Sequence, residues 1–291
     1  MSAKLALLCP GQGAQHRDMF ALTAAVVQLP PDDAQLFENR YAQPLIVDAT
    51  LAMWQAIRSF VPQPALVAGY SVGELSAYGV AGALTNADAH HIAGERARLM
   101  DACRTPKAPQ VMLAVAAISI GGLKPCLLRH GFHLAIENGD ANFVVGGLER
   151  ERDALVADLL ALGAAVTPLA VQIASHTPLM VGAVAGFAEV LTQNPLGPMT
   201  MPVLAGINAA KMITPEAATA TLLRQLTEPV RWAACMDALA ESGITVALEL
   251  GPGATLSRML QQRHPQIACR SVADFRSLRG IEVWLERQCS D

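Results

Sequence analysis

Short, uninterrupted apolar runs are followed by glycine turns in the first part of the chain. The run at residues 4–9 stops at Pro10-Gly11-Gln12-Gly13, and the run at residues 65–69 stops at a second glycine turn, residues 71–73. Residues 74–82 then have the spacing of a helix. Uninterrupted apolar runs are typical of strands buried on both faces. The pattern therefore predicts a parallel sheet covered by helices.

The pattern changes in the middle of the chain. Residues 88–103 have helical spacing, and the segment Thr105-Pro106-Lys107-Ala108-Pro109 then breaks the chain. Beyond this break the alternation predicts strands and helices in the ferredoxin-like order strand-helix-strand-strand-helix-strand. The predicted ranges are strand 111–119, helix 122–129, strand 133–137, strand 142–147, helix 149–162 and strand 165–173.

This ferredoxin-like segment is predicted to be an insertion. After Pro178 the helical and strand patterns resume, and they end in a buried strand at residues 245–250, followed by a glycine turn. We expect that last strand to return to the first sheet. Residues 1–108 and 176–291 would then form one large α/β domain, with residues 109–175 as a small subdomain.

Composition narrows the possible functions. Hydrophobic residues make up 52% of the 291 residues and charged residues 16%, which excludes a disordered chain. The formal net charge of −4 argues against a nucleic-acid-binding protein. No apolar run is long enough for a signal peptide or a membrane span. Six scattered cysteines without a close pair suggest reduced, mostly buried thiols and no metal site. We expect a cytoplasmic protein.

The segment Gly69-Tyr70-Ser71-Val72-Gly73 matches the G-x-S-x-G nucleophile elbow. Small glycines allow the tight turn between strand and helix that exposes the serine hydroxyl. The following helix directs its free N–H groups at any oxyanion formed there. The alternative is that Ser71 is only a helix N-cap. The position between a predicted strand and a predicted helix favours the elbow.

A serine nucleophile needs a base, and His176 is the best-placed histidine. It lies in Ser175-His176-Thr177-Pro178, just after the predicted strand, where functional side chains are often displayed. The alternative is an ordinary surface histidine, as we expect for residues 16, 130, 133 and 264. No acidic residue is clearly placed to orient His176, which argues against an ordinary esterase. A backbone carbonyl could orient the ring instead.

Two further features have weaker signals. Gly11-Gln12-Gly13 lacks the third glycine of a dinucleotide-binding loop, but its backbone N–H groups could contribute to an oxyanion hole. Arg96 lies in an otherwise apolar helix. A lone helical arginine is usually solvated, but one facing the cleft could bind a carboxylate through its planar fork.

Taken together, these residues resemble the acyltransferase family typified by malonyl-CoA:acyl-carrier-protein transacylase. The resemblance covers nearly the whole chain and implies an α/β fold, a hydrolase-like parallel-sheet domain with an inserted ferredoxin-like subdomain. The motifs that carry it are Pro10-Gly11-Gln12-Gly13-Ala14-Gln15, Gly69-Tyr70-Ser71-Val72-Gly73-Glu74, Arg96, Ser175-His176, Arg224-Gln225-Leu226 with Pro229-Val230-Arg231-Trp232, and Glu249-Leu250-Gly251-Pro252-Gly253.

The resemblance also implies roles at matching positions. Ser71 would be the acylated nucleophile and His176 its general base, with the backbone carbonyl of Gln225 on the far side of the ring. Arg96 would pair with the free carboxylate of a malonyl group. The remaining positions are the oxyanion-hole N–H groups of Gln12 and Val72, and Asn142, Met112 and Tyr70 near the acyl pocket.

The chain departs from the family pattern at several positions. Tyr70 replaces the histidine usual before the serine, and Ala97 stands where glycine commonly follows the arginine. Ser175 precedes His176 as in stand-alone transacylases. The segment between Gln15 and Ser71 is short, so the early helices should be trimmed. These departures suggest a branch with a dedicated carrier protein, such as the acyltransferase subunit of malonate decarboxylase or a discrete polyketide acyltransferase.

The resulting hypothesis is a serine acyltransferase that moves a malonyl group from malonyl-CoA to the pantetheine thiol of an acyl carrier protein. It would need no permanently bound cofactor or metal, and no nucleic acid or membrane as a partner. Two alternatives remain open. One is a serine thioesterase or esterase, which would pass the acyl group to water. The other is a non-catalytic subunit that binds a carrier protein.

Overall fold

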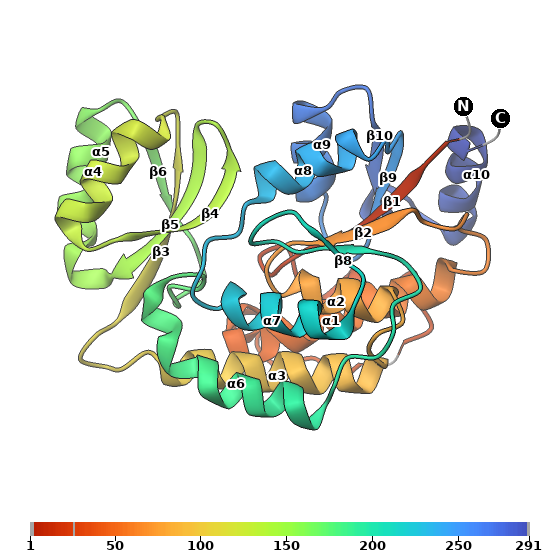
Figure 1. The fold of residues 1–291 in the computed structure, drawn as a ribbon, viewed down its shortest axis with the longest axis horizontal. Helices are drawn as coiled ribbons and strands as arrows, with labels where there is room; N and C mark the ends of the chain where they lie inside the picture. The colour runs from red at the N-terminus through yellow and green to blue at the C-terminus, as the bar shows by residue number, and fades with distance from the viewer. Residues whose placement is uncertain (1–2, 26, 290–291) are drawn as a thin grey trace.

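Two separate β-sheets organise the chain in the computed structural model, which describes residues 3–25 and 27–289 (Figure 1). The larger sheet has six strands in the order β10-β9-β1-β2-β7-β8. Its strands are β1 (Leu5–Cys9), β2 (Leu66–Gly69), β7 (Val203–Leu204), β8 (Lys211–Met212), β9 (Val246–Glu249) and β10 (Ala268–Ser271). All neighbouring strands are parallel except β7 and β8.

The apolar runs form strands because both faces of this sheet are covered. In β1, Leu5, Leu7 and Cys9 pack into one hydrophobic cluster, and Ala6 and Leu8 pack into another on the opposite face. Such alternation requires apolar residues at every position of the strand. The predicted parallel sheet is therefore confirmed, and β9 pairs with β1 as expected. Strand β10, beyond β9, was not expected.

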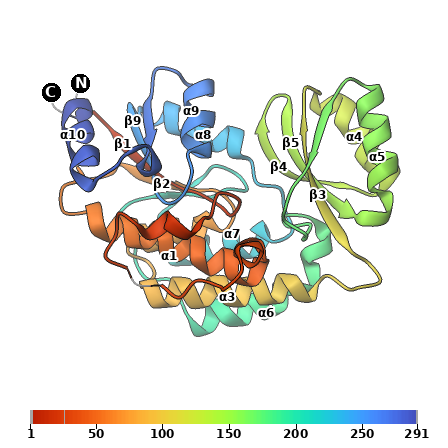
Figure 2. The same cartoon turned by 180° about the vertical axis from the view of Figure 1, so that it is seen from behind.

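Helices cover both faces of the large sheet. Figures 1 and 2 show α8 and α9 on one side, with α1, α2, α3, α6 and α7 on the other. The bounds are α1 (Asn39–Ile57), α2 (Gly73–Val80), α3 (Asn86–Ala102), α6 (Val181–Gln193), α7 (Pro215–Gln225), α8 (Trp232–Glu241), α9 (Thr255–Arg263) and α10 (Leu278–Cys289). Before α1, the described residues that follow β1 include the 3₁₀ turns Arg17–Phe20 and Asp33–Phe37. Trimmed early helices between Gln15 and Ser71 stay a prediction.

The smaller sheet has the predicted ferredoxin-like pattern. Its four antiparallel strands have the order β4-β5-β3-β6, and two helices cover one face. The elements are β3 (Gln110–Ala116), α4 (Ile120–His130), β4 (His133–Gly139), β5 (Asn142–Leu148), α5 (Arg152–Ala161) and β6 (Ala165–Pro168). Leu113 packs under the helices, whereas Met112 packs on the other face with residues of the large sheet. The uncovered face therefore lies toward the large sheet.

The first and last strands of the small sheet both end before their predicted limits, and β3 stops at Ala116 instead of residue 119. The range 165–173 was expected to be a strand, but β6 ends at Pro168 and one more backbone bond joins Leu169 N–H to Met112. Proline has no N–H with which to continue a ladder. The chain then leaves the small sheet and reaches His176 through an irregular segment. His176 consequently lies eight residues beyond the strand, in a left-handed backbone conformation with φ 62°.

No helix within residues 3–25 and 27–289 is long and apolar enough to cross a membrane. All six cysteines are free thiols, and four of them are buried.

Candidate active site

Ser71 lies in a tight turn between β2 and α2. Its φ of 57° is unusual for a residue with a side chain, and such strain is typical of a nucleophile elbow. A Cβ atom added to Gly69 would lie 2.3 Å from the Gly73 carbonyl oxygen, and one added to Gly73 would lie 2.2 Å from the Cys9 carbonyl oxygen. Larger residues would therefore force the turn apart. The flanking glycines are required by this close backbone approach.

His176 joins this serine from a distant part of the chain. Its Nε2 lies 2.7 Å from Ser71 Oγ, and its Nδ1 lies 2.6 Å from the backbone carbonyl oxygen of Gln225. Because a carbonyl can only accept, Nδ1 carries the proton and Nε2 is free to accept the serine hydroxyl. Burial, followed by the charge of Arg96, lowers the pKa of His176 to about 3. The ring is therefore a neutral base at physiological pH.

The end of α7 supplies the carbonyl that orients the ring. Gln225 is the last residue of α7, where carbonyl groups have no partner within the helix. A helix C-terminus also carries partial negative charge, which stabilises an imidazolium when the base takes a proton. A backbone carbonyl thus occupies the place that a carboxylate holds in a serine-histidine-aspartate triad.

Two backbone N–H groups beside Ser71 are available to an oxyanion. Within the described residues, neither the Gln12 nor the Val72 N–H has a hydrogen-bond acceptor. Val72 is the N-cap of α2, and Gln12 belongs to the turn after β1. That turn approaches the elbow closely, since a Cβ on Gly11 would lie 2.8 Å from the Tyr70 carbonyl oxygen. The arrangement suits an oxyanion hole.

Ser71 opens into a cavity of about 340 Å³ between the two sheets. Met112, Ile136 and Val144 of the small sheet form one wall, and Leu256 and Met259 of α9 belong to another. This lining is largely apolar, which strengthens electrostatic interactions at the reacting atoms.

The asparagine beside this cavity is not the one expected from the sequence. Asn142 is exposed on β5 and lies outside the cavity, whereas Met112 lines it as predicted. Asn142 directly follows the tight connection from β4 and is the first residue of β5, at the end of that strand. Asn138 lines the cavity instead, and its Oδ1 accepts a hydrogen bond of 3.1 Å from the hydroxyl of Tyr70.

Tyr70 closes the cavity next to the nucleophile. Its ring meets Trp232 edge-on, with centroids 5.4 Å apart. Burial raises the pKa of Tyr70 to about 12, so the hydroxyl stays protonated and donates to Asn138. Tyr70 therefore connects the elbow of the large sheet to β4 of the small sheet.

Arg96 lies behind the dyad and is only 2% exposed. It does not line the cavity of Ser71. Its Nη1 donates to Gln43 Oε1 at 2.6 Å, and its Nη2 donates to Gln225 Oε1 at 3.3 Å. Burial lowers the pKa of Arg96 to about 10, which still leaves it protonated at neutral pH. The sequence favoured a solvated arginine unless it faced a cleft, and neither description fits this buried position.

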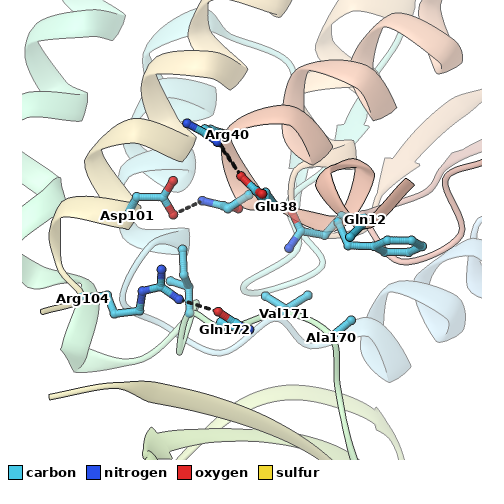
Figure 3. A pocket seen from close by; sticks show the side chains of 12 residues that line it. Gln12, Glu38, Arg40, Asp101, Arg104, Ala170, Val171 and Gln172 are labelled. Atoms are coloured by element: carbon cyan, nitrogen blue, oxygen red, sulfur yellow. Dashed lines mark hydrogen bonds and ion pairs between the residues drawn. The ribbon is translucent and has the colours of Figure 1, made fainter. Parts of the chain in front are cut away.

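A second, more polar cavity of about 570 Å³ lies beyond the loop that carries Gln12 (Figure 3). Gln12 and Val171 line both cavities and so form the wall between them. In Figure 3, Arg40 pairs with Glu38, and Arg104 donates to Gln172. The arginines at this cavity are thus already engaged by neighbouring side chains.

Three of the six other histidines pair with aspartates away from the dyad. His90 contacts Asp48 at 2.9 Å, His130 contacts Asp158 at 2.8 Å, and His264 contacts Asp237 at 2.8 Å. No group of three His, Cys, Asp or Glu side chains among the described residues is arranged to hold a metal ion.

Comparison with known proteins agrees with this geometry. The model of the acyl transferase domain family matches residues 17–278. The chain therefore belongs to the acyl transferase domain family and is an acyltransferase.

Within this family the chain is similar, over nearly its whole length, to malonyl CoA-acyl carrier protein transacylases. The protein of that name from Mycobacterium tuberculosis is 31% identical over 95% of this chain and 100% of the relative. The one from Haemophilus influenzae is 27% identical over 97% of this chain and 99% of the relative.

Solved structures show the same fold. The transacylase of Coxiella burnetii superposes with a TM-score of 0.90 at 22% identity, covering 99% of both chains. A malonyl-transacylase solved in complex with its type II polyketide acyl-carrier protein has a TM-score of 0.88 at 26% identity. That comparison covers 95% of this chain and 98% of the other.

Proposed function

We propose that this acyltransferase moves a malonyl group from malonyl-CoA, through an ester on Ser71, to the pantetheine thiol of an acyl carrier protein. The observation that carries the proposal is the hydrogen-bonded series Ser71 Oγ, His176 and the Gln225 carbonyl, with the arginine Arg96 held behind it. The names of the relatives and the carrier-protein complex of a similar structure support the choice of donor and acceptor.

In the first half-reaction His176 Nε2 takes the hydroxyl proton as Ser71 Oγ bonds to the thioester carbon. The N–H groups of Gln12 and Val72 stabilise the oxyanion. When the intermediate collapses, the carbon–sulfur bond breaks and the sulfur of coenzyme A leaves with the proton from His176.

The second half-reaction reverses these steps with another thiol. The carrier's pantetheine thiol gives its proton to His176 and attacks the acyl carbon. Ser71 Oγ then leaves and recovers the proton. No bound metal or redox group is required. The resemblance to the family assigns the free carboxylate of the malonyl group to Arg96, which is held by Gln43 and Gln225 behind the dyad when no donor is bound. A buried carboxylate needs a charged partner of this kind.

Intact-mass measurement after addition of malonyl-CoA tests the proposal. We expect a malonyl adduct that maps to Ser71 and is discharged by holo carrier protein much faster than by water. Ser71→Ala should abolish the adduct, while its circular dichroism spectrum and melting curve stay close to those of the wild type.

Each of the other outcomes has a clear meaning. An adduct on another residue in Ser71→Ala would overturn the assignment of the nucleophile. Discharge to water at the same rate as to the thiol would identify a thioesterase. The complete absence of an adduct on the wild-type protein would favour a non-catalytic carrier-binding subunit.

A further inference from the structure

Arg96 is held by two amides and has no direct carboxylate partner among the described residues. The nearest acidic group in its hydrogen-bond network is Glu74, which lies on the other side of the Gln225 side chain. Gln225 Oε1 accepts from Arg96, and Gln225 Nε2 donates to Glu74 Oε2 at 2.5 Å. The amide dipole therefore lies with its negative end toward the cation and its positive end toward the carboxylate.

Glu74 is 1% exposed and is used by nothing in the mechanism above. Its Oε2 also accepts the Gly206 backbone N–H at 2.9 Å, and its Oε1 accepts the Tyr78 hydroxyl at 3.4 Å. A buried carboxylate with such bonds fixes whatever is bonded to it. Glu74 therefore fixes the side chain of Gln225. The backbone carbonyl of Gln225 orients His176, and its side chain holds Arg96.

We propose that Glu74 is a positioning and specificity-determining residue, which fixes the Gln225 amide and acts as the remote counter-charge of Arg96 until the carboxylate of the acyl donor arrives. This inference rests on the proposed function, because it requires Arg96 to meet the donor's carboxylate. The new element is a competition between Glu74 and the donor carboxylate for Arg96.

Glu74 and the carboxylate of the donor compete for Arg96 because both are negatively charged. Without donor, the buried cation Arg96 and the carboxylate Glu74 balance each other across one amide. A donor carboxylate at Arg96 brings a second negative charge into the same enclosed region, where like charges repel strongly. Removing the charge of Glu74 should therefore improve the binding of a dicarboxylic acyl group and leave a monocarboxylic one unaffected.

The surroundings of Glu74 favour such coupling. Burial raises the pKa of Glu74 to about 7, while the bonds from Gly206, Gln225 and Tyr78 and the charge of Arg96 oppose that rise. The other titratable groups that face this pair are Tyr78 on α2, Cys235 on α8 and His176. Burial, and after it the charge of Glu74, raises the pKa of Tyr78 and of Cys235, whereas burial, and after it the charge of Arg96, lowers the pKa of His176. A charged donor bound at Arg96 would favour the protonated form of Glu74.

Glu74→Gln tests the role of the charge. The amide oxygen can still accept from Gly206 and Gln225, so this variant removes the charge with little change of shape. The measurement is kcat/KM for malonyl-CoA divided by kcat/KM for acetyl-CoA. We expect this ratio to rise about fivefold or more, the lower end of typical coupling between two sites, mainly through a lower KM for malonyl-CoA. Glu189→Gln, on the exposed face of α6, is the matched control and should leave the ratio unchanged.

Glu74→Ala separates positioning from charge. It removes the acceptor as well, so we expect the rates with both donors to fall through misplacement of Gln225. The inference is overturned if Glu74→Gln leaves the ratio unchanged, or lowers both rates equally, while Arg96→Ala still abolishes the preference for malonyl. Loss of any Arg96 effect would overturn the proposed function itself.

The wild-type protein provides a second measurement that needs no folded variant. Between pH 6 and 8, Glu74 loses its proton and competes more strongly for Arg96, whereas the malonyl carboxylate stays ionised. The malonyl-to-acetyl ratio should therefore fall as the pH rises, and effects on the shared base cancel in that ratio. A ratio that is flat across this range would also overturn the inference.

Discussion

The two sides of the Ser71–His176 pair differ in almost every physical property. On one side is an apolar cavity of about 340 Å³, bounded by methionine and aliphatic side chains from the small sheet and α9. On the other is a buried polar network in which Arg96, Gln225 and Glu74 are hydrogen-bonded in series. The cavity can select a donor by shape, whereas the network can select it by charge. Variants on the two sides should therefore fail in different ways.

The largest effect on the acylation rate is expected at His176, which lies between the apolar cavity and the polar network. His176→Ala removes the base but leaves the oxyanion hole, so acylation of Ser71 should slow by roughly three orders of magnitude or more. The rate is measured by stopped-flow release of coenzyme A. A loss below tenfold would show that another group takes the proton.

The low pKa of His176 adds a pH dependence to this prediction. A pKa of about 3 means that the ring is neutral above that value, so the base form is lost only as the pH falls toward 3. With acetyl-CoA, which has no free carboxylate, the acylation rate should therefore be flat between pH 5 and 8. A steep fall below pH 7 would contradict this prediction.

Arg96→Ala tests the charged side alone. Loss of a buried, hydrogen-bonded charge pair costs about 2–5 kcal/mol, which corresponds to roughly a 30-fold to several-thousand-fold slower malonyl transfer. Transfer from acetyl-CoA should be unchanged or improved, so the preference between the donors should nearly invert. Equal loss with both donors, or a wild-type protein that uses both equally well, would make Arg96 structural.

The features that depend on residues close together in the chain could be predicted from the sequence. The elbow could be predicted because Gly69 and Gly73 are needed by a turn only five residues long, and the two sheets because their strands have different apolar patterns. The limits at residues 108/109 and 175/176 stay a prediction, since the fold itself does not define where one domain ends.

The polar network could not be predicted in this way. Gln43, Glu74, Arg96 and Gln225 come from α1, α2, α3 and α7, and no local spacing indicates that their side chains meet. The one available signal is that Glu74 directly follows the elbow, on a helix that is buried on nearly all sides. The resemblance indicated Asn142 but gave no signal for Asn138, which lies on the other side of the same tight connection and lines the cavity.

The smallest effect is expected on the apolar side, at Tyr70. Tyr70→Phe keeps the ring that packs on Trp232 but removes the hydroxyl that donates to Asn138. A neutral hydrogen bond contributes about 0.5–1.5 kcal/mol, so the free energy of unfolding should fall by roughly that amount. Donor preference should not change, because neither partner belongs to the charged network.

The pair Tyr70 and Asn138 also allows the connection between the sheets to be measured directly. Asn138→Ala leaves the tyrosine hydroxyl without its partner, and a double-mutant cycle with Tyr70→Phe isolates their interaction. Chemical denaturation of the four proteins should give a coupling of about 0.5 kcal/mol or more. The same four proteins, assayed with both donors, should show a malonyl-to-acetyl ratio that stays constant. Additive stabilities would mean that the hydroxyl is equally well satisfied by water. A changed malonyl-to-acetyl ratio would show that the apolar cavity and the polar network do not act independently. The donor's shape and its charge would then be selected together.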